Sequence, residues 1–210
     1  MAAERGPGGE RGRSNRPPFV GLTGGIAAGK SEALAALERL GAATLSSDAV
    51  VHELLLTDEV RDLIVERLGP EVAPAGRIDR GAVATAVFER PDDRAWLEQA
   101  LWPRVGERIA AWREDQVARE PPPSAAVVEA PLLFEAGMDA VFDATVAVVA
   151  DDETRRRRAS ERGQRALGSR STRQLDQGEK ARRADFVITN DGDLGDLEES
   201  LRGVLATIGA

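Results

Sequence analysis

The 210-residue chain has no cysteine and a single histidine. Without thiols it forms neither a disulfide nor a thiolate metal site, which excludes the protein classes that depend on either. Apolar residues make up 42% of the sequence, yet no apolar run approaches the roughly 20 residues of a membrane span. The first residues also lack the apolar core of a secretory signal. We therefore expect a cytoplasmic protein with a sizeable core and no membrane partner.

Positive charge is the scarcer sign, with 28 lysines and arginines against 36 acidic residues and a net charge of −8. This balance argues against broad electrostatic binding to nucleic acid. The arginines nevertheless gather late in the chain, where we expect a lid at about 155–180. They occupy positions 155–158 and recur at Arg162, Arg165, Arg170, Arg173, Arg182 and Arg183. An acidic protein with one local basic stretch suits a small phosphorylated substrate.

One short motif carries most of the functional information: positions 24–31 read G-G-I-A-A-G-K-S. This is the phosphate-binding pattern G-x-x-x-x-G-K-S, in which glycines let backbone N–H groups turn inward around phosphate oxygens. Lys30 would place a charge on the β- and γ-phosphates, and Ser31 would offer its hydroxyl to Mg²⁺. The alternative is a glycine-rich turn that matches by chance. The predicted ATP-binding residues here are Gly24, Gly25, Ile26, Ala27, Ala28, Gly29, Lys30, Ser31 and Glu32.

The flanks of the motif support the phosphate-binding interpretation. The apolar run 19–23 predicts a buried strand, and residues 31–40 carry apolar side chains at helical spacing. Strand, loop and helix in this order place the helix N-terminus against the phosphates. The chain is therefore expected to bind a nucleoside triphosphate.

Strand-like and helix-like segments alternate over residues 18–210, which predicts one α/β domain. Residues 1–17 are rich in glycine, arginine, glutamate and proline and are expected to form a disordered tail. Helical patterns fill residues 58–118, with Asp79 as an expected N-cap and a break allowed at Pro103. We expect a parallel five-stranded sheet flanked by helices, with 58–118 as a substrate-binding insertion. The expected strands are 19–23, 42–46, 125–129, 144–149 and 186–189.

Acidic and apolar residues follow the ends of these strands. In a parallel sheet, ligands sit beyond the carboxyl ends, so the phosphate loop, Asp48 and Glu129 can converge. Asp48 either takes a proton from an attacking hydroxyl or caps the helix that begins at Ala49, and position alone leaves both open. Glu129 is either a metal-associated carboxylate or an ordinary strand-end acid. The run 132–134, Leu-Leu-Phe, either packs into the core or lines a pocket.

Three more residues are candidate functional residues because of their positions in the sequence. Arg80 and Arg104, within the helical insertion, are candidates to bind a phosphorylated acceptor, with plain surface charge as the alternative. His52 lies one helical turn after Asp48, and a structural role is favoured over a catalytic one. Spacing alone does not tell which arginine of the lid reaches the nucleotide.

The ordered set of motifs resembles the dephospho-CoA kinase family. The matching segments are 22–31, Asp48 with 52–54, 131–135, 179–180, 183–188 and Asn190, together with 78–80, 87–88, 96–98 and 101–103. The resemblance implies a P-loop kinase core with a helical CoA-binding insertion and a lid. It also implies transfer of the γ-phosphoryl group of ATP to the ribose 3′-hydroxyl of dephospho-CoA, with Mg²⁺ as cofactor. We expect a monomer or a weak homo-oligomer.

The resemblance assigns roles to individual residues. Asp48 matches the family's catalytic aspartate and acts with Lys30. Arg158 of the lid and Asn190 join the ATP-binding residues, and Ser31 with Glu129 are the expected metal ligands. The expected acceptor-binding residues are Asp48, His52, Arg80, Arg104, Pro131, Leu132, Leu133, Phe134 and Glu135.

Several positions depart from the family's usual pattern. Positions 46–48 read Ser-Ser-Asp where Asp-Ala-Asp is usual, and Glu129 stands where aspartate is common. Positions 27–28 read Ala-Ala where Gly-Ser is frequent, an exchange that is expected to be tolerated if φ stays negative. Glu32 replaces a frequent threonine near the phosphates, and Trp102 replaces a histidine. Two alternatives therefore stay open: another small-molecule kinase, such as a nucleoside or nucleotide kinase, and a non-catalytic nucleotide-binding relative.

Overall fold

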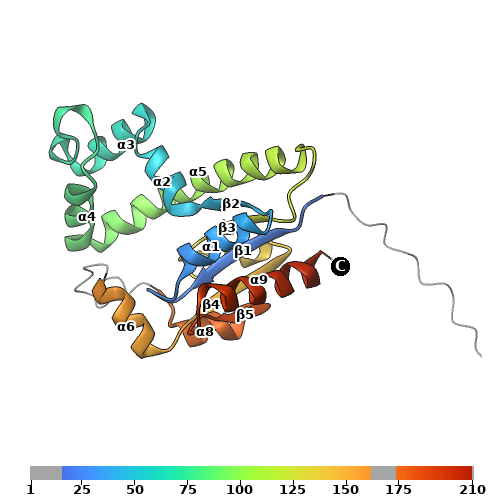
Figure 1. Ribbon diagram of the computed structural model, residues 1–210. Helices are drawn as coiled ribbons and strands as arrows, with labels where there is room; N and C mark the ends of the chain where they lie inside the picture. The colour runs from blue at the N-terminus through green and yellow to red at the C-terminus, as the bar shows by residue number, and fades with distance from the viewer. Residues whose placement is uncertain (1–15, 162–173, 210) are drawn as a thin grey trace, which may run out of the picture.

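The computed structural model describes residues 16–161 and 174–209, and its centre is a five-stranded parallel sheet (Figure 1). The strand order is β2-β3-β1-β4-β5, so the first strand of the chain lies in the middle. The predicted α/β class and the five parallel strands are confirmed. All but two residues of the expected tail, and residues 162–173 of the expected lid, lie outside the described residues. The strands are β1 (Phe19–Gly24), β2 (Ala43–Ser46), β3 (Ala126–Glu129), β4 (Ala144–Val149) and β5 (Phe186–Thr189).

Side-chain alternation along the strands divides the apolar residues between two cores, one on each face of the sheet. Ala126 and Val128 of β3 belong to the core that contains Phe19, whereas Val127 belongs to the core that contains Leu22. All six residues of β1 are buried, as expected for a central strand that is covered on both faces. The sheet is therefore the middle layer of the molecule.

Helices supply the outer layers (Figure 1). On one face α1 packs against α9, and on the other α2 packs against the long α5, while α8 contacts β1 and β4. Their bounds are α1 (Lys30–Arg39), α2 (Ser47–Leu54), α3 (Asp58–Leu68), α4 (Arg80–Glu89), α5 (Pro91–Val117), α6 (Asp152–Glu161), α8 (Gln177–Arg183) and α9 (Leu194–Ile208). Three short 3-10 helices span Pro70–Val72, Pro74–Gly76 and Asp139–Val141.

The segment between β2 and β3 is helical, and α3 and α4 stand apart from the sheet at one end of α5 (Figure 1). Asp79 is confirmed as the N-cap of α4. The break allowed at Pro103 does not occur, because α5 continues through this residue as one helix of 27 residues. Leu101, Val105 and Ile109 lie at helical spacing around the proline and are all buried. Their burial holds the helix together across the lost backbone hydrogen bond.

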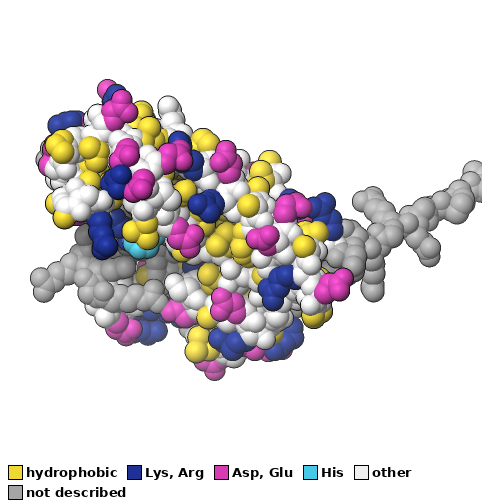
Figure 2. Space-filling model, turned by 90° about the horizontal axis from the view of Figure 1, so that it is seen from above, with side chains coloured by type: hydrophobic (Ala, Val, Ile, Leu, Met, Phe, Trp, Pro, Cys, Tyr) yellow, Lys and Arg dark blue, Asp and Glu magenta, His cyan; other side chains and the backbone are white. Residues whose placement is uncertain are grey.

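Within residues 16–161 and 174–209, no helix is both long and apolar enough to cross a membrane. On the face drawn in Figure 2, acidic and basic side chains are interspersed, so neither sign of charge dominates that side.

The end of β1 approaches β4 more closely than a side chain would allow. Gly24 has φ +152°, and a Cβ atom there would lie 2.1 Å from the carbonyl oxygen of Val148. Position 24 therefore requires glycine. This contact links fold and site, because the phosphate-binding turn starts at the next residue.

We expect Gly24→Ala to lower the free energy of unfolding by about 3 kcal/mol, since the clash is with backbone that cannot rotate away. Gly203→Ala in α9 is the matched control, because an added Cβ there meets nothing within 4 Å. A glycine-to-alanine change inside a helix stabilises by roughly 0.5–1 kcal/mol. Urea unfolding measures both variants, and equal stability of the two would contradict the packing of β1 on β4.

Candidate active site

The phosphate-binding motif forms the turn between β1 and α1. Gly29 is the N-cap of α1 with φ +100°, and a Cβ atom there would lie 2.0 Å from the amide nitrogen of Asn190. That amide donates a 2.9 Å hydrogen bond to the carbonyl oxygen of Ala28. The guanidinium of Arg158 donates to the carbonyl oxygen of Asn190 at 2.9 Å and reaches that of Ala28 at 3.4 Å. The structure therefore brings Arg158 and Asn190, two of the expected ATP-binding residues, to the loop.

Ala27 has a left-handed backbone conformation, with φ +61°. The condition under which alanine is expected to be tolerated here, a negative φ, is therefore not met at Ala27. The Cβ atom of an L-residue crowds the backbone in this region, at a cost of about 1–2 kcal/mol. The tight reversal between Gly25 and Gly29 imposes the conformation, so the turn stores strain at Ala27.

Lys30 begins α1 and folds back over the turn. Its ammonium donates to the carbonyl oxygens of Gly25 at 3.0 Å and Gly24 at 3.3 Å. A phosphate oxygen would take over these donors, because an ammonium binds an anion more strongly than it binds a neutral carbonyl group. Ser31 follows in the first turn of the helix and is exposed. Lys30, which is predicted to contact phosphate, and Ser31, which is predicted to bind Mg²⁺, are therefore both at the N-terminus of α1.

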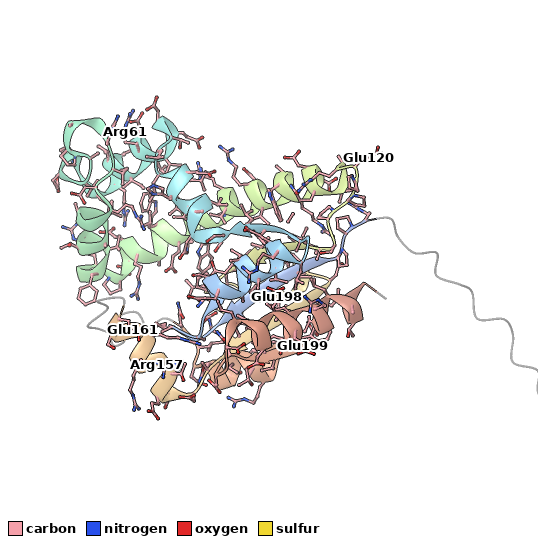
Figure 3. The ribbon with its side chains drawn as sticks, viewed as in Figure 1. Arg61, Glu120, Arg157, Glu161, Glu198 and Glu199 are labelled. Carbon is pink, nitrogen blue, oxygen red and sulfur yellow. The ribbon has the colours of Figure 1, made fainter. Side chains whose placement is uncertain are left out.

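A hollow of about 390 Å³ opens beside this turn, and we call it the donor hollow. Helix α6 contributes two of its lining residues, and the segment after β5 contributes four. Figure 3 labels Glu161 at the C-terminal end of α6, and Arg157, which is exposed on the outer side of the same helix. Adjacent arginines of the basic run thus face in different directions. The lining residues are Glu32, Arg158, Glu161, Asn190, Gly192, Asp193 and Leu194.

Ser46 and Glu129 lie opposite each other in the pairing of β2 with β3. The Ser46 hydroxyl donates a 3.0 Å hydrogen bond to the Glu129 carboxylate. Burial raises the pKa of Glu129, and the Lys30 ammonium and the Ser46 hydrogen bond partly offset this rise. An aspartate at position 46 would place a second carboxylate against this acid, whereas serine places a donor there. Serine at position 46 and glutamate at position 129 both depart from the family pattern, and they are compatible because one donates a hydrogen bond to the other.

The donor set at this edge of the sheet fits a magnesium ion that also binds phosphate. Hydroxyl and carboxylate oxygens, which Ser31 and Glu129 carry, are ligands of the type that Mg²⁺ takes. Among residues 16–161 and 174–209, no group of three or more His, Cys, Asp or Glu side chains is placed to hold a metal ion by itself. Mg²⁺ usually keeps several waters and binds through few protein ligands plus substrate phosphates.

Asp48 lies in the first turn of α2, as the second residue of the helix. The N-cap is Ser46, whose side chain makes no capping hydrogen bond. The interpretation of Asp48 as a helix cap is therefore wrong. Its side chain is exposed and lines a pocket of about 450 Å³ under α5, which we call the apolar pocket.

The apolar pocket lies between α2, α5 and the loop that follows β3. The indole of Trp102 is 42% exposed at its wall. Leu132 also lines the pocket, whereas Leu133 and Phe134 are buried in the core. Within the Leu-Leu-Phe run, the first residue therefore lines a pocket, and the other two pack into the core. The lining residues are Phe19, Ser47, Asp48, Val51, Trp102, Val105, Gly106, Ile109, Ala110, Arg113, Ala130, Pro131, Leu132, Ala136, Gly137, Met138 and Val141.

Besides Leu133 and Phe134, three more of the expected acceptor-binding residues do not line this pocket. Arg104 pairs with Glu59 at 2.6 Å beside a separate hollow. Arg80 is exposed at the start of α4, and His52 is exposed on α2. Sequence spacing could not reveal this, because the direction of a helical side chain depends on how the helix packs.

Glu135 also faces away from the pocket and pairs with Lys180 of α8, with 3.1 Å between Oε1 and Nζ. Lys180 is fully buried. Burial lowers the pKa of its ammonium, and the Glu135 carboxylate raises that pKa in turn. Lys180 also donates to the carbonyl oxygen of Pro131 and lies 3.5 Å from the hydroxyl of Thr23. Lys180 lies in one of the segments that resemble the dephospho-CoA kinase family, but the sequence alone assigns it no role.

Because Asp48 caps no helix, we expect Asp48→Asn to change the free energy of unfolding by less than about 0.5 kcal/mol. Asp79→Ala is the matched control, since Asp79 accepts hydrogen bonds from the N–H groups of Gly81 and Ala82. Loss of such a cap costs about 1 kcal/mol. Urea denaturation compares the two variants, and a loss at Asp48 as large as that at Asp79 would show that Asp48 stabilises its helix.

Known proteins resemble this chain over most of its length. A sequence model of the family described as dephospho-CoA kinase matches residues 18–196. The dephospho-CoA kinase of Symbiobacterium thermophilum is 41% identical over 182 residues, which cover 84% of this chain and 75% of that protein. The one from Protochlamydia amoebophila is 36% identical, with 87% and 92% covered. A crystal structure from Thermus thermophilus, 33% identical, superposes with a TM-score of 0.75 over 91% of this chain and 98% of that one. The chain belongs to the dephospho-CoA kinase family.

Proposed function

We propose that this protein transfers the γ-phosphoryl group of ATP to the ribose 3′-hydroxyl of dephospho-CoA. The observation that carries the proposal is the position of Asp48, an exposed carboxylate on the wall of the apolar pocket. The phosphate-binding turn opens at the same edge of the sheet, because β1, β2 and β3 are parallel. Membership of the family supports the same reaction.

The donor half of the site is the phosphate-binding turn together with the donor hollow. The ammonium of Lys30 and the N–H groups at the start of α1 would bind the β- and γ-phosphates of ATP. Arg158 sits between the turn and the hollow, where a guanidinium can hold two phosphate oxygens at once. The donor hollow is then the place for the adenosine part of ATP.

Ser31 and Glu129 are the residues that we expect to hold Mg²⁺. The ion, when bound, would neutralise charge on the β- and γ-phosphate oxygens. The hydrogen bond from Ser46 orients the Glu129 carboxylate and favours its ionised form, the form that binds a metal.

The acceptor chemistry centres on Asp48. Its carboxylate takes the proton of the 3′-hydroxyl as that oxygen attacks the γ-phosphorus. A bond between the 3′-oxygen and phosphorus forms, the bond from phosphorus to the β,γ-bridging oxygen breaks, and ADP leaves with that electron pair. Lys30 stabilises the charge on the transferred group. Positioning and charge stabilisation therefore carry most of the catalysis.

The apolar pocket suits an acceptor that has an uncharged arm in addition to its nucleotide. Its wall is mostly aliphatic, which favours the methylene groups of pantetheine. The exposed indole of Trp102 offers a flat surface on which a purine can stack. For a nucleotide kinase we expect the whole 132–134 run to be buried in the core. The place of Leu132 on the pocket wall favours dephospho-CoA.

We expect steady ADP release in a coupled assay with ATP, Mg²⁺ and dephospho-CoA, and little with nucleoside monophosphates as acceptors. Asp48→Asn should lower kcat about 10²–10⁴-fold, because the base acts in the chemical step. Its affinity for ATP should stay within about twofold of the original value, since Asp48 is on the acceptor side. Transfer to a nucleoside monophosphate in place of dephospho-CoA would overturn the proposal, and near-normal turnover of the variant would remove Asp48 from the mechanism.

Arg158→Ala should weaken the binding of a non-hydrolysable ATP analogue about tenfold or more, because a hydrogen bond to a charged group contributes roughly 1.5–3 kcal/mol. Arg157→Ala is the matched control, since it removes the same charge from the exposed side of α6. Isothermal titration measures both affinities at one ionic strength. Equal weakening in the two variants would mean that only the net charge of α6 matters.

A further inference from the structure

The chain contains only two lysines among its 28 basic residues, Lys30 and Lys180. Arginine occupies every other basic position. Lys30 is the lysine of the phosphate-binding turn, where a compact ammonium is required. An ammonium is a small point charge with three rotatable donors, whereas a guanidinium is a wide planar fork. The retention of lysine at position 180 therefore argues for a site that accepts only the smaller group.

The surroundings of Lys180 support this argument. The side chain has no exposed surface, and a buried charge is costly unless it is paired and hydrogen-bonded. Its partners are the Glu135 carboxylate, the Pro131 carbonyl oxygen and the Thr23 hydroxyl. Glu135 and Pro131 belong to the loop after β3, and Thr23 lies just before the phosphate-binding turn. One ammonium thus joins the loop beside the apolar pocket to the root of the donor site.

The same helix also contacts the donor side one turn earlier. The amide of Gln177 donates to the carbonyl oxygen of Ala150 at 2.7 Å and accepts from its N–H at 3.2 Å. Its side-chain oxygen would lie 2.9 Å from a Cβ atom on Gly25, so it packs directly on the phosphate-binding turn. The carboxylate of Glu135 in turn accepts the N–H of Leu175, just before α8. Helix α8 is therefore attached to both halves of the site.

We infer that Lys180 is a positioning residue, which holds the loop 130–136 at a fixed distance from the phosphate-binding turn so that the acceptor hydroxyl meets the γ-phosphate. The identity of that acceptor rests on the proposed function. Ala130, Pro131, Leu132 and Ala136 of this loop line the apolar pocket, so a shift of the loop moves the acceptor. A misplacement of about 1 Å between reacting groups can cost on the order of 10²-fold in rate.

The test is a double variant, Lys180→Met with Glu135→Gln, because removal of the lysine alone would leave a buried carboxylate without its counter-charge. The variant keeps similar side-chain volumes and removes both charges. We expect kcat with dephospho-CoA to fall about 10²-fold, while the affinity for an ATP analogue stays within about twofold. Glu135→Gln alone leaves Lys180 a hydrogen-bond acceptor but removes its counter-charge, and it should lower kcat by a smaller factor of about ten.

Hydrogen–deuterium exchange gives a readout that does not depend on the acceptor. We expect the backbone amides of residues 132–136 to exchange at least about tenfold faster in the double variant, and those of α9 to be unchanged. Arg182→Met is the matched control, because Arg182 is exposed on α8 and pairs only at the surface with Glu179. It should alter neither kcat nor exchange in 132–136.

The outcomes separate this inference from the proposed function. Unchanged kcat and unchanged exchange in both Glu135 variants, with only a lower melting temperature, would overturn the positioning role. Failure of the unaltered protein to use dephospho-CoA would overturn the proposed function, and the exchange rates of residues 132–136 would still decide the role of Lys180.

Discussion

The parallel pairing of β1 with β3 on one side and with β4 on the other is the constraint on which the site depends. Because these strands share one direction, the phosphate-binding turn, Asp48 and Glu129 come from distant parts of the chain to one edge of the sheet. The pairing is close enough that Gly24 tolerates no Cβ atom against Val148. A change in register or spacing would therefore move the donor residues relative to the acceptor pocket.

Three features near this edge of the sheet lower the stability of the folded state. Ala27 has a left-handed backbone, Glu129 is an acid whose pKa burial raises, and Lys180 is a fully buried cation. Apolar residues of similar volume in place of a buried ion pair are often neutral or stabilising. These costs lie next to the phosphate-binding turn and the loop after β3, where strain and buried charge commonly accompany function. The core elsewhere is the ordinary aliphatic packing of the two sheet faces.

Local sequence signals predicted much of the structure. The strand, turn and helix around the phosphate-binding motif, the five apolar strand segments and the Asp79 cap each depend on neighbouring residues, and all three are confirmed. The break allowed at Pro103 does not occur because burial of the flanking apolar residues overrides the local preference of proline. The left-handed backbone of Ala27 is imposed by the tight turn around it, which the residue type alone does not reveal. The directions of Arg104 and Glu135, and the burial of Lys180, follow from contacts between distant segments, which spacing cannot reveal. The roles of Asp48 in catalysis and of Lys180 in positioning are proposals.

The central claim is that Asp48 and the phosphate-binding turn act on one pair of substrates. A crystal structure with Mg²⁺, a non-hydrolysable ATP analogue and dephospho-CoA tests it most directly. We expect the γ-phosphate against Lys30, and the 3′-hydroxyl oxygen within about 3 Å of the Asp48 carboxylate, which is the reach of a general base. Dephospho-CoA bound outside the apolar pocket, with its 3′-hydroxyl beyond direct or single-water reach of Asp48, would contradict the account.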